Sequence, residues 1–309
     1  LDLHPNYVVS VEEVLKNAVN KLLLRYGTLE LFCKAGGGFD RTLPGLPSYV
    51  ADWSHIPTAQ PLYWHFYEGP QTVTPKESGI SLHRNGKLQM KLFDLDYIEK
   101  VSEPLLGAGG IDESRRLLSW FDAAEQMAVS GARDPYPMIA PSRPGVSLFE
   151  AFWRTIIANS TSKRTRAPED WYHGYLRYKC TLSKRCEMTP TSLFESLEQY
   201  QDQYRDPMDR TVATMMDWFN MMLITSWNRA FCVTRNGMLG LVPPGALPGD
   251  LVSLLPGGAV PFVMRPKDLS ESNGELELVG ESYFHGVTAI DAMKEFRNDG
   301  KEPHSIFLV

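Results

Sequence analysis

The part of the chain from residue 229 to 309 alternates short apolar segments with turn residues, and this pattern limits its fold to β-structure. Segments 231–234 and 238–242 flank Asn236-Gly237, a pair that readily adopts the positive φ of a tight hairpin turn. Further apolar segments follow at 251–255, 261–265 and 275–280, with Gly249-Asp250 as a second turn. Four or five short strands at this spacing predict a small closed barrel or a sandwich.

Helical patterns occupy much of the rest of the chain. Ser10 with Glu13, and Ser147 with Glu150, form capping boxes that open amphipathic segments, the first of which ends at Gly27. Apolar residues at helical spacing also predict helices at 112–130, 148–158, 168–179, 192–204 and 208–227. The last segment is apolar on nearly every side, so we expect it to be the central core helix.

A second β-pattern lies in the first half, where segments 80–83 and 88–93 flank Asn85-Gly86. The predicted fold class is therefore α+β, with about five or six helices, a β-rich N-terminal portion and a small C-terminal β-barrel-like module. We divide the chain into a mixed α/β lobe with a hairpin (1–135), a helical core segment (136–228) and a small β module (229–309). These parts should form one compact unit, because the apolar helix at 208–227 needs a shared core.

Composition excludes several classes of function. The net charge is −6, which argues against nucleic acid as a partner because phosphate contacts need a basic face. No apolar run reaches the length of about 18 residues that a membrane span needs, so we expect a cytoplasmic protein. Glycine-rich segments lack a phosphate-loop sequence, and the cysteine spacing fits neither a zinc site nor a redox motif. We therefore expect no cofactor and no metal.

Two polar clusters are candidates for chemistry. Glu281, Tyr283 and His285 alternate along a predicted strand, so they should share one face. A carboxylate, a phenol and an imidazole can perform acid–base catalysis, although such a row also occurs as a hydrogen-bonded barrel surface. Asp52-Trp53-Ser54-His55 forms the other cluster. This cluster has two interpretations. It has an architectural role, with Trp53 buried and Asp52 accepting backbone hydrogen bonds, or it forms a ligand site.

The ordered segments 229–243, 248–265 and 278–286 resemble the C-terminal region of fungal heterokaryon-incompatibility (HET) proteins. Residues 5–14 resemble the segment that follows the HET domain, and residues 46–54 (LPSYVADWS) resemble a family signature. Tyr49 stands where the family usually has Trp, Ala51 where it has Pro, and Asn6 where it has Asp. The matched positions with an expected structural role are Asp52, Trp53, Gly237, Gly249, Asp250 and Gly286.

The resemblance implies a fungal protein of non-self recognition and programmed cell death, with the HET domain upstream of this chain. This chain would then be a support, regulatory or partner-recognition region, and its partner would be another protein or the upstream HET domain. The alternative is a HET-like enzyme of fungal secondary metabolism that acts on a small apolar metabolite. In that case His285, Glu281, Tyr283 and Asp52 would be the catalytic residues.

Overall fold

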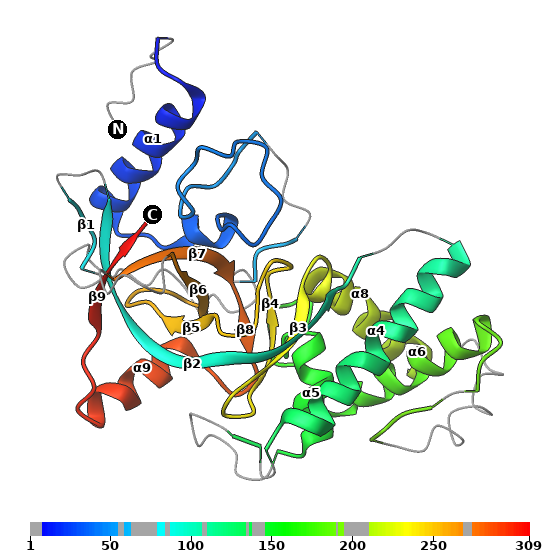
Figure 1. The fold of residues 1–309 in the computed structure, drawn as a ribbon. Helices are drawn as coiled ribbons and strands as arrows, with labels where there is room; N and C mark the ends of the chain where they lie inside the picture. Colours follow the sequence, from blue (N-terminus) through cyan, green and yellow to red (C-terminus); the bar gives the residue numbers. More distant parts are fainter. Residues whose placement is uncertain are drawn as a thin grey trace.

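The computed structural model describes residues 8–54, 59–62, 79–83, 87–106, 110–133, 136–137, 146–189, 191–194, 210–267 and 274–309. These residues form six α-helices and nine β-strands, which confirms the α+β class (Figure 1). The helices are α1 (Val11–Tyr26), α4 (Gly110–Gly131), α5 (Leu148–Ile156), α6 (Tyr172–Arg185), α8 (Arg210–Ser226) and α9 (Ala289–Asn298). Short 3-10 helices are η1 (Glu30–Lys34) and η2 (Glu169–Trp171).

Five strands close into the barrel that the C-terminal pattern predicts. They are β2 (Leu88–Pro104), β5 (Leu251–Leu254), β6 (Phe262–Pro266), β7 (Glu275–Glu281) and β9 (His304–Leu308). The order is β5-β6-β7-β9-β2, and a second pairing between β2 and β5 closes the circle. The closing strand β2 comes from the first half of the chain and curves around the barrel (Figure 1). Closure removes the exposed edges that an open sheet would have.

The far half of β2 carries a second set of strands. There β2 pairs with β3 (Ala230–Thr234), which pairs with β4 (Leu239–Val242), which pairs with β8 (Tyr283–Phe284). The hairpin between β3 and β4 turns at the predicted place, where Gly237 has a φ of 84°. At the other end of β2, β1 (Ser81–Leu82) forms the predicted antiparallel pair. The turn residues of that pair, 84–86, lie outside the described residues.

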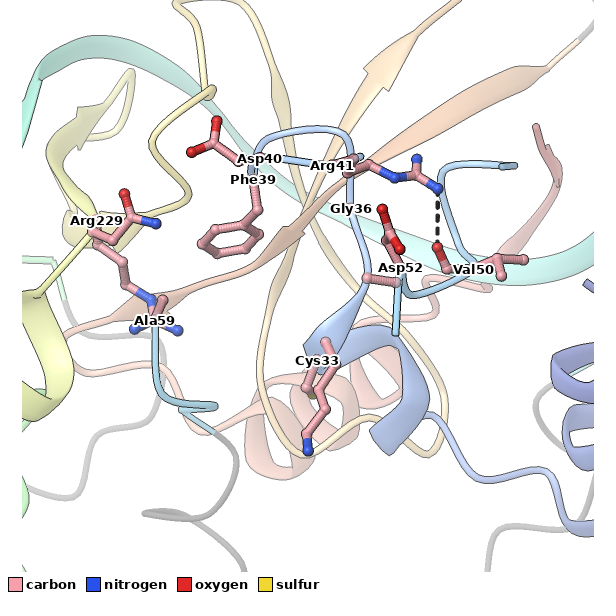
Figure 2. Close-up of a pocket in the computed structure, with 12 residues that line it drawn as sticks. Cys33, Gly36, Phe39, Asp40, Arg41, Val50, Asp52, Ala59 and Arg229 are labelled. Atoms are coloured by element: carbon pink, nitrogen blue, oxygen red, sulfur yellow. Dashed lines mark hydrogen bonds between the residues drawn. The ribbon is translucent and has the colours of Figure 1, made fainter. Parts of the chain in front are cut away.

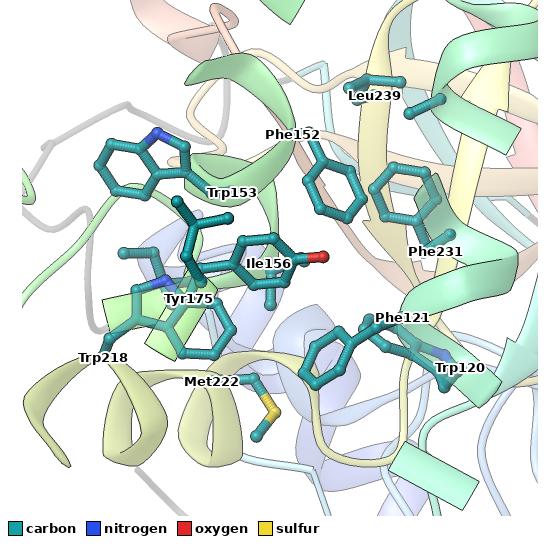
Figure 3. Close-up of a cluster of buried hydrophobic side chains, with 14 of the residues drawn as sticks. Trp120, Phe121, Phe152, Trp153, Ile156, Tyr175, Trp218, Met222, Phe231 and Leu239 are labelled. Carbon is teal, nitrogen blue, oxygen red and sulfur yellow. The ribbon is translucent and has the colours of Figure 1, made fainter. Parts of the chain in front are cut away.

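Helices α4, α5, α6 and α8 pack together against β3 and β4 and bury a core rich in aromatic side chains (Figure 3). Trp218 on α8 is fully buried in this core, whereas Met216 on the same helix is 45% exposed. Helix α8 therefore packs into the core, as expected, through the face that carries Trp218, and leaves the side that carries Met216 at the surface. Apolar composition alone overestimates burial, because folded proteins expose many apolar atoms.

The helix boundaries follow the capping signals closely. Ser10 and Ser147 accept hydrogen bonds from the backbone N–H groups of Glu13 and Glu150, and Gly27 ends α1 in the left-handed conformation. The expected helix at 192–204 falls mostly outside the described residues. Helix α9 was not predicted; it covers Phe93 and Leu254 of the barrel with its own apolar face.

Strand pairing crosses both expected boundaries of the chain. Strand β2 pairs with β3 and β9, and the backbone N–H of Leu105 donates to the carbonyl of Arg229. The three-part division stays a prediction, and the closed barrel needs strands from its first and last parts. None of the helices in the described ranges has the length and apolar character to cross a membrane.

Candidate functional site

A pocket opens between the loop that follows η1 and the connection from α8 to β3 (Figure 2). It holds about 510 Å³ of space, including solvent at its mouth. Its lining mixes charged and polar side chains with apolar ones. The lining residues are Cys33, Lys34, Ala35, Gly36, Phe39, Asp40, Arg41, Val50, Asp52, Ala59, Asn228 and Arg229.

Arg229 contributes a buried guanidinium to this pocket. Its Nη2 lies 2.6 Å from Oε1 of Glu281, and both side chains are at most 1% exposed. Arg229 also donates to the carbonyl oxygens of Thr225 and Gln60. The backbone N–H of Leu62 donates to the Glu281 carboxylate at 2.5 Å. Burial lowers the pKa of Arg229, and the charge of Glu281 opposes that shift. The pair therefore connects β7, the start of β3 and the segment 60–62.

Cys33 lies beside this ion pair. Burial first, and then the charge and hydrogen bonding of Glu281, raise the pKa of the Cys33 thiol well above its usual value. The group stays protonated at neutral pH and is a poor nucleophile in that form, because thiol reactivity depends on the thiolate. All four cysteines are buried free thiols. Within the described ranges, no group of three or more His, Cys, Asp or Glu side chains is arranged to hold a metal ion.

Asp52 organises the signature loop. Its Oδ2 accepts hydrogen bonds from the backbone N–H groups of Thr42 and Leu43, and its Oδ1 accepts one from that of Ser54. Burial alone would raise the pKa of Asp52, but the hydrogen bonds from Ser54, Thr42 and Leu43 together lower it far below its usual range. Asp52 is therefore an anchored carboxylate and not a proton acceptor. The expected backbone contacts are present, but the expected burial of Trp53 is wrong, since it is 45% exposed.

Tyr283 and His285 meet in the interior, away from the pocket lining. Tyr283 Oη and His285 Nδ1 share a hydrogen bond of 3.0 Å, and the hydroxyl of Tyr136 donates to the carbonyl oxygen of His285. Burial, followed by the charges of Arg154 and Arg166, lowers the pKa of His285 to about 3. Burial also raises the pKa of Tyr283. Both groups are therefore neutral at physiological pH.

The structure divides the predicted catalytic row. It brings Tyr283 and His285 together, whereas the short contacts of Glu281 are to Arg229 and Leu62. Strand β7 ends at Glu281 and pairs within the barrel, while β8 begins at Tyr283 and pairs with β4. The row is thus shared between two strands with different neighbours.

Sequence reasoning missed Arg229 and Cys33. A signal for Arg229 was available, because a single charge there separates an apolar helix from an apolar strand, and a buried charge requires a partner. No comparable sequence signal marks Cys33.

The remaining signature residues lie in turns. Gly237, Gly249 and Gly286 all have positive φ angles. Asp250 binds Arg265 through two hydrogen bonds of 2.8 and 2.7 Å and accepts a third from the backbone N–H of Leu247. These positions shape the chain between strands.

The closed barrel with a layer of helices against its extended sheet defines an α+β barrel protein, whose candidate acid and base groups are engaged by other protein groups. A sequence match to the Het-6 beta-barrel domain extends over residues 145–300, and the chain belongs to this family. It is thereby related to heterokaryon-incompatibility proteins. Strands β2 and β9 lie outside the matched residues, although both are needed to close the barrel. No curated protein and no solved structure matches the chain.

Proposed function

We propose that this chain is a non-catalytic partner-recognition and support region of a fungal, cytoplasmic HET-type protein that distinguishes self from non-self. In this proposal an upstream HET domain produces the growth-arrest or cell-death response. This chain forms the folded support that regulates the response of the HET domain. Four buried free thiols are consistent with a reducing compartment.

The observation that carries the proposal is the engagement of the four candidate acid–base residues by protein groups. Glu281 binds Arg229, Asp52 binds Thr42, Leu43 and Ser54, and Tyr283 binds His285. A general base must accept a proton near the working pH. The low pKa of His285 and the anchored carboxylate of Asp52 do not meet this requirement.

The signature loop supports an architectural role for residues 46–54. The backbone N–H of Ser48 donates to the carbonyl oxygen of Val309, at the end of the chain, and the Ser48 hydroxyl accepts a hydrogen bond from Leu278 of β7. Tyr49 is buried and donates to Asn20 of α1. The loop therefore ties α1, the barrel and the C-terminus together.

Trp53 is the position in this loop that supports partner recognition. It is half-exposed next to Asp52, whose hydrogen bonds hold the backbone on either side. An aromatic side chain presented on a rigid backbone loses little conformational entropy on binding, and Trp is enriched among the residues that dominate protein interfaces. We propose that Trp53 contacts the protein partner.

The enzyme alternative is tested by Tyr283→Phe, which removes only the hydroxyl group bound to His285. The full-length protein, wild type or variant, is expressed in a fungal recipient strain that mounts the incompatibility reaction, and colony growth is measured. We expect growth arrest of wild-type strength. Loss of arrest by a variant that melts at the wild-type temperature would contradict the proposal and favour catalysis at this pair.

A further inference from the structure

We propose that Ser192 is a phosphorylation site whose modification releases residues 191–194 from the helical layer. The hydroxyl of Ser192 donates to Oε1 of Glu125 at 3.0 Å, and the backbone N–H of Leu193 donates to Oε2 of the same carboxylate at 2.9 Å. Glu125 belongs to α4 and its side chain is 1% exposed. These two hydrogen bonds therefore attach the segment to one buried carboxylate.

The surroundings of Glu125 already balance its charge. Lys179 of α6 is fully buried, and its Nζ lies 2.9 Å from Oε1 of Glu125 and 2.8 Å from Oδ1 of Asp122. The hydroxyl of Tyr175 also donates to Glu125. The single positive charge of Lys179 is thus shared between two carboxylates. A further negative charge placed next to Glu125 would be repelled.

An aromatic contact completes the attachment of the segment. The ring of Phe194 lies 5.4 Å from that of Phe149 and 5.0 Å from that of Phe152, between ring centroids. Phe152 belongs to the buried core of the helical layer, as Figure 3 shows. Leu193, in contrast, is 55% exposed. A segment attached by so few contacts opens locally at a low free-energy cost.

The position of Ser192 suits a kinase that acts on the detached segment. Ser192 is only partly buried, and its neighbours Thr191 and Leu193 are exposed. In the sequence, Glu195 follows three residues after Ser192, and an acid there is complementary to a basic substrate groove. ATP supplies the γ-phosphoryl group. The bond from Ser192 Oγ to phosphorus forms, the bond to the leaving oxygen of ADP breaks, and the hydroxyl proton passes to the catalytic base of the kinase.

Phosphorylation would prevent the segment from returning to Glu125. A phosphoserine carries a charge of about −1.5 to −2 at pH 7 and no longer offers the hydroxyl proton that Glu125 accepts. The docked arrangement would place this charge against a buried carboxylate, so the equilibrium shifts to the detached state. Phe194 then leaves Phe149 and Phe152, whose rings become accessible.

Hydrogen exchange of the Leu193 amide measures this release. The whole 309-residue chain is prepared with phosphoserine incorporated during translation at position 192 and compared with the unmodified chain by NMR. We expect the protection factor of this amide to fall at least about tenfold, and phosphatase treatment should restore it. Equal protection in the modified and unmodified chains would overturn the proposal.

Phosphoserine incorporated in place of Thr191 is the matched control. It carries the same group one residue earlier, on an exposed side chain, while the contacts of Ser192 and Leu193 with Glu125 remain. We expect the Leu193 amide to keep its protection in this chain. An equal loss at the two positions would show that the contact with Glu125 does not decide the effect, and would overturn the proposed release.

Mass spectrometry of the full-length protein purified from the fungal recipient strain tests whether the site is used. We expect a phosphate on Ser192 in the wild-type protein and its loss from the same peptide in Ser192→Ala. An unmodified Ser192 in the wild-type protein would overturn its assignment as a phosphorylation site. The proposal does not depend on the recognition function, because neither measurement reads growth arrest.

Discussion

Arg229 and Glu281 form an ion pair that is withdrawn from solvent, with 2.6 Å between Nη2 and Oε1. Arg229 lies just before β3 and Glu281 ends β7, so the pair links the two sets of strands that extend from β2. Removal of one partner leaves an uncompensated buried charge.

Glu281→Gln should therefore lower the free energy of unfolding by about 3–5 kcal/mol. Urea unfolding followed by tryptophan fluorescence measures this loss. Asp291→Asn is the matched control, because Asp291 pairs with Lys294 on the exposed face of α9, where a pair contributes at most about 1 kcal/mol. Similar losses in the two variants would mean that burial does not determine the importance of the Arg229–Glu281 pair.

Trp218→Ala should cost about 3–5 kcal/mol, because the indole is fully buried among Phe121, Tyr175 and Tyr178. Met216→Ala, on the exposed side of the same helix, should change stability by no more than about 0.5 kcal/mol. Both values come from chemical unfolding monitored by circular dichroism. A large loss in Met216→Ala would show that this side of α8 is covered in solution.

Gly237→Ala should destabilise more than Gly249→Ala, although both residues have positive φ angles. An alanine at Gly249 meets no atom within 4 Å, so it should cost only the backbone term of about 1–2 kcal/mol. A Cβ at Gly237 would lie 2.6 Å from the backbone nitrogen of Arg133, and the clash should add at least about 1 kcal/mol. Equal melting temperatures for the two variants would contradict the close approach at Gly237.

His285 should make stability depend on pH. Its pKa in the folded state is about 3, below the value of about 6.5 in an unfolded chain. Protons therefore bind the unfolded chain preferentially, and the contribution of neutral His285 is complete above about pH 6.5 and decreases as pH falls toward 3. Between pH 7 and 5.5 the loss should be about 1 kcal/mol.

The measurement is urea unfolding of wild type and His285→Gln at pH 7 and 5.5. The variant lacks the titrating group, so its stability should fall about 1 kcal/mol less than that of wild type over this interval. The buried contacts with Tyr136 and Tyr283 also imply a stability cost in His285→Gln at both pH values. If the free energy of unfolding falls equally with pH in the two proteins, His285 is not the source of the pH dependence.

Local signals in the sequence predicted the elements of this fold well. Capping boxes located the starts of α1 and α5, and Asn236-Gly237 located the turn between β3 and β4. Each of these signals depends on a few neighbouring residues. The role of β2 was not predictable in this way, because one strand pairs with β5 and β9 at one end and β3 at the other. Such pairings depend on contacts across the whole chain.

The candidate site was predicted only as a set of residue types. Glu281, Tyr283 and His285 have the spacing of one strand face, but the chain passes from β7 to β8 at Ser282, whose backbone N–H and hydroxyl both donate to Pro261. The partner of Glu281 is 52 residues away in the sequence. The exposure of the Trp53 side chain was also hard to predict. The indole is largely apolar, but it is half-exposed next to Asp52, whose two carboxylate oxygens already accept hydrogen bonds.

The central claim is that this chain recognises a protein partner through its signature loop, and Trp53→Ala tests it most directly. Growth of the fungal recipient strain is measured with full-length wild type, Trp53→Ala and Tyr97→Ala, the last being an exposed aromatic of the barrel. We predict that Trp53→Ala abolishes growth arrest at an unchanged melting temperature, while Tyr97→Ala retains it. Full arrest with Trp53→Ala would contradict recognition at this loop.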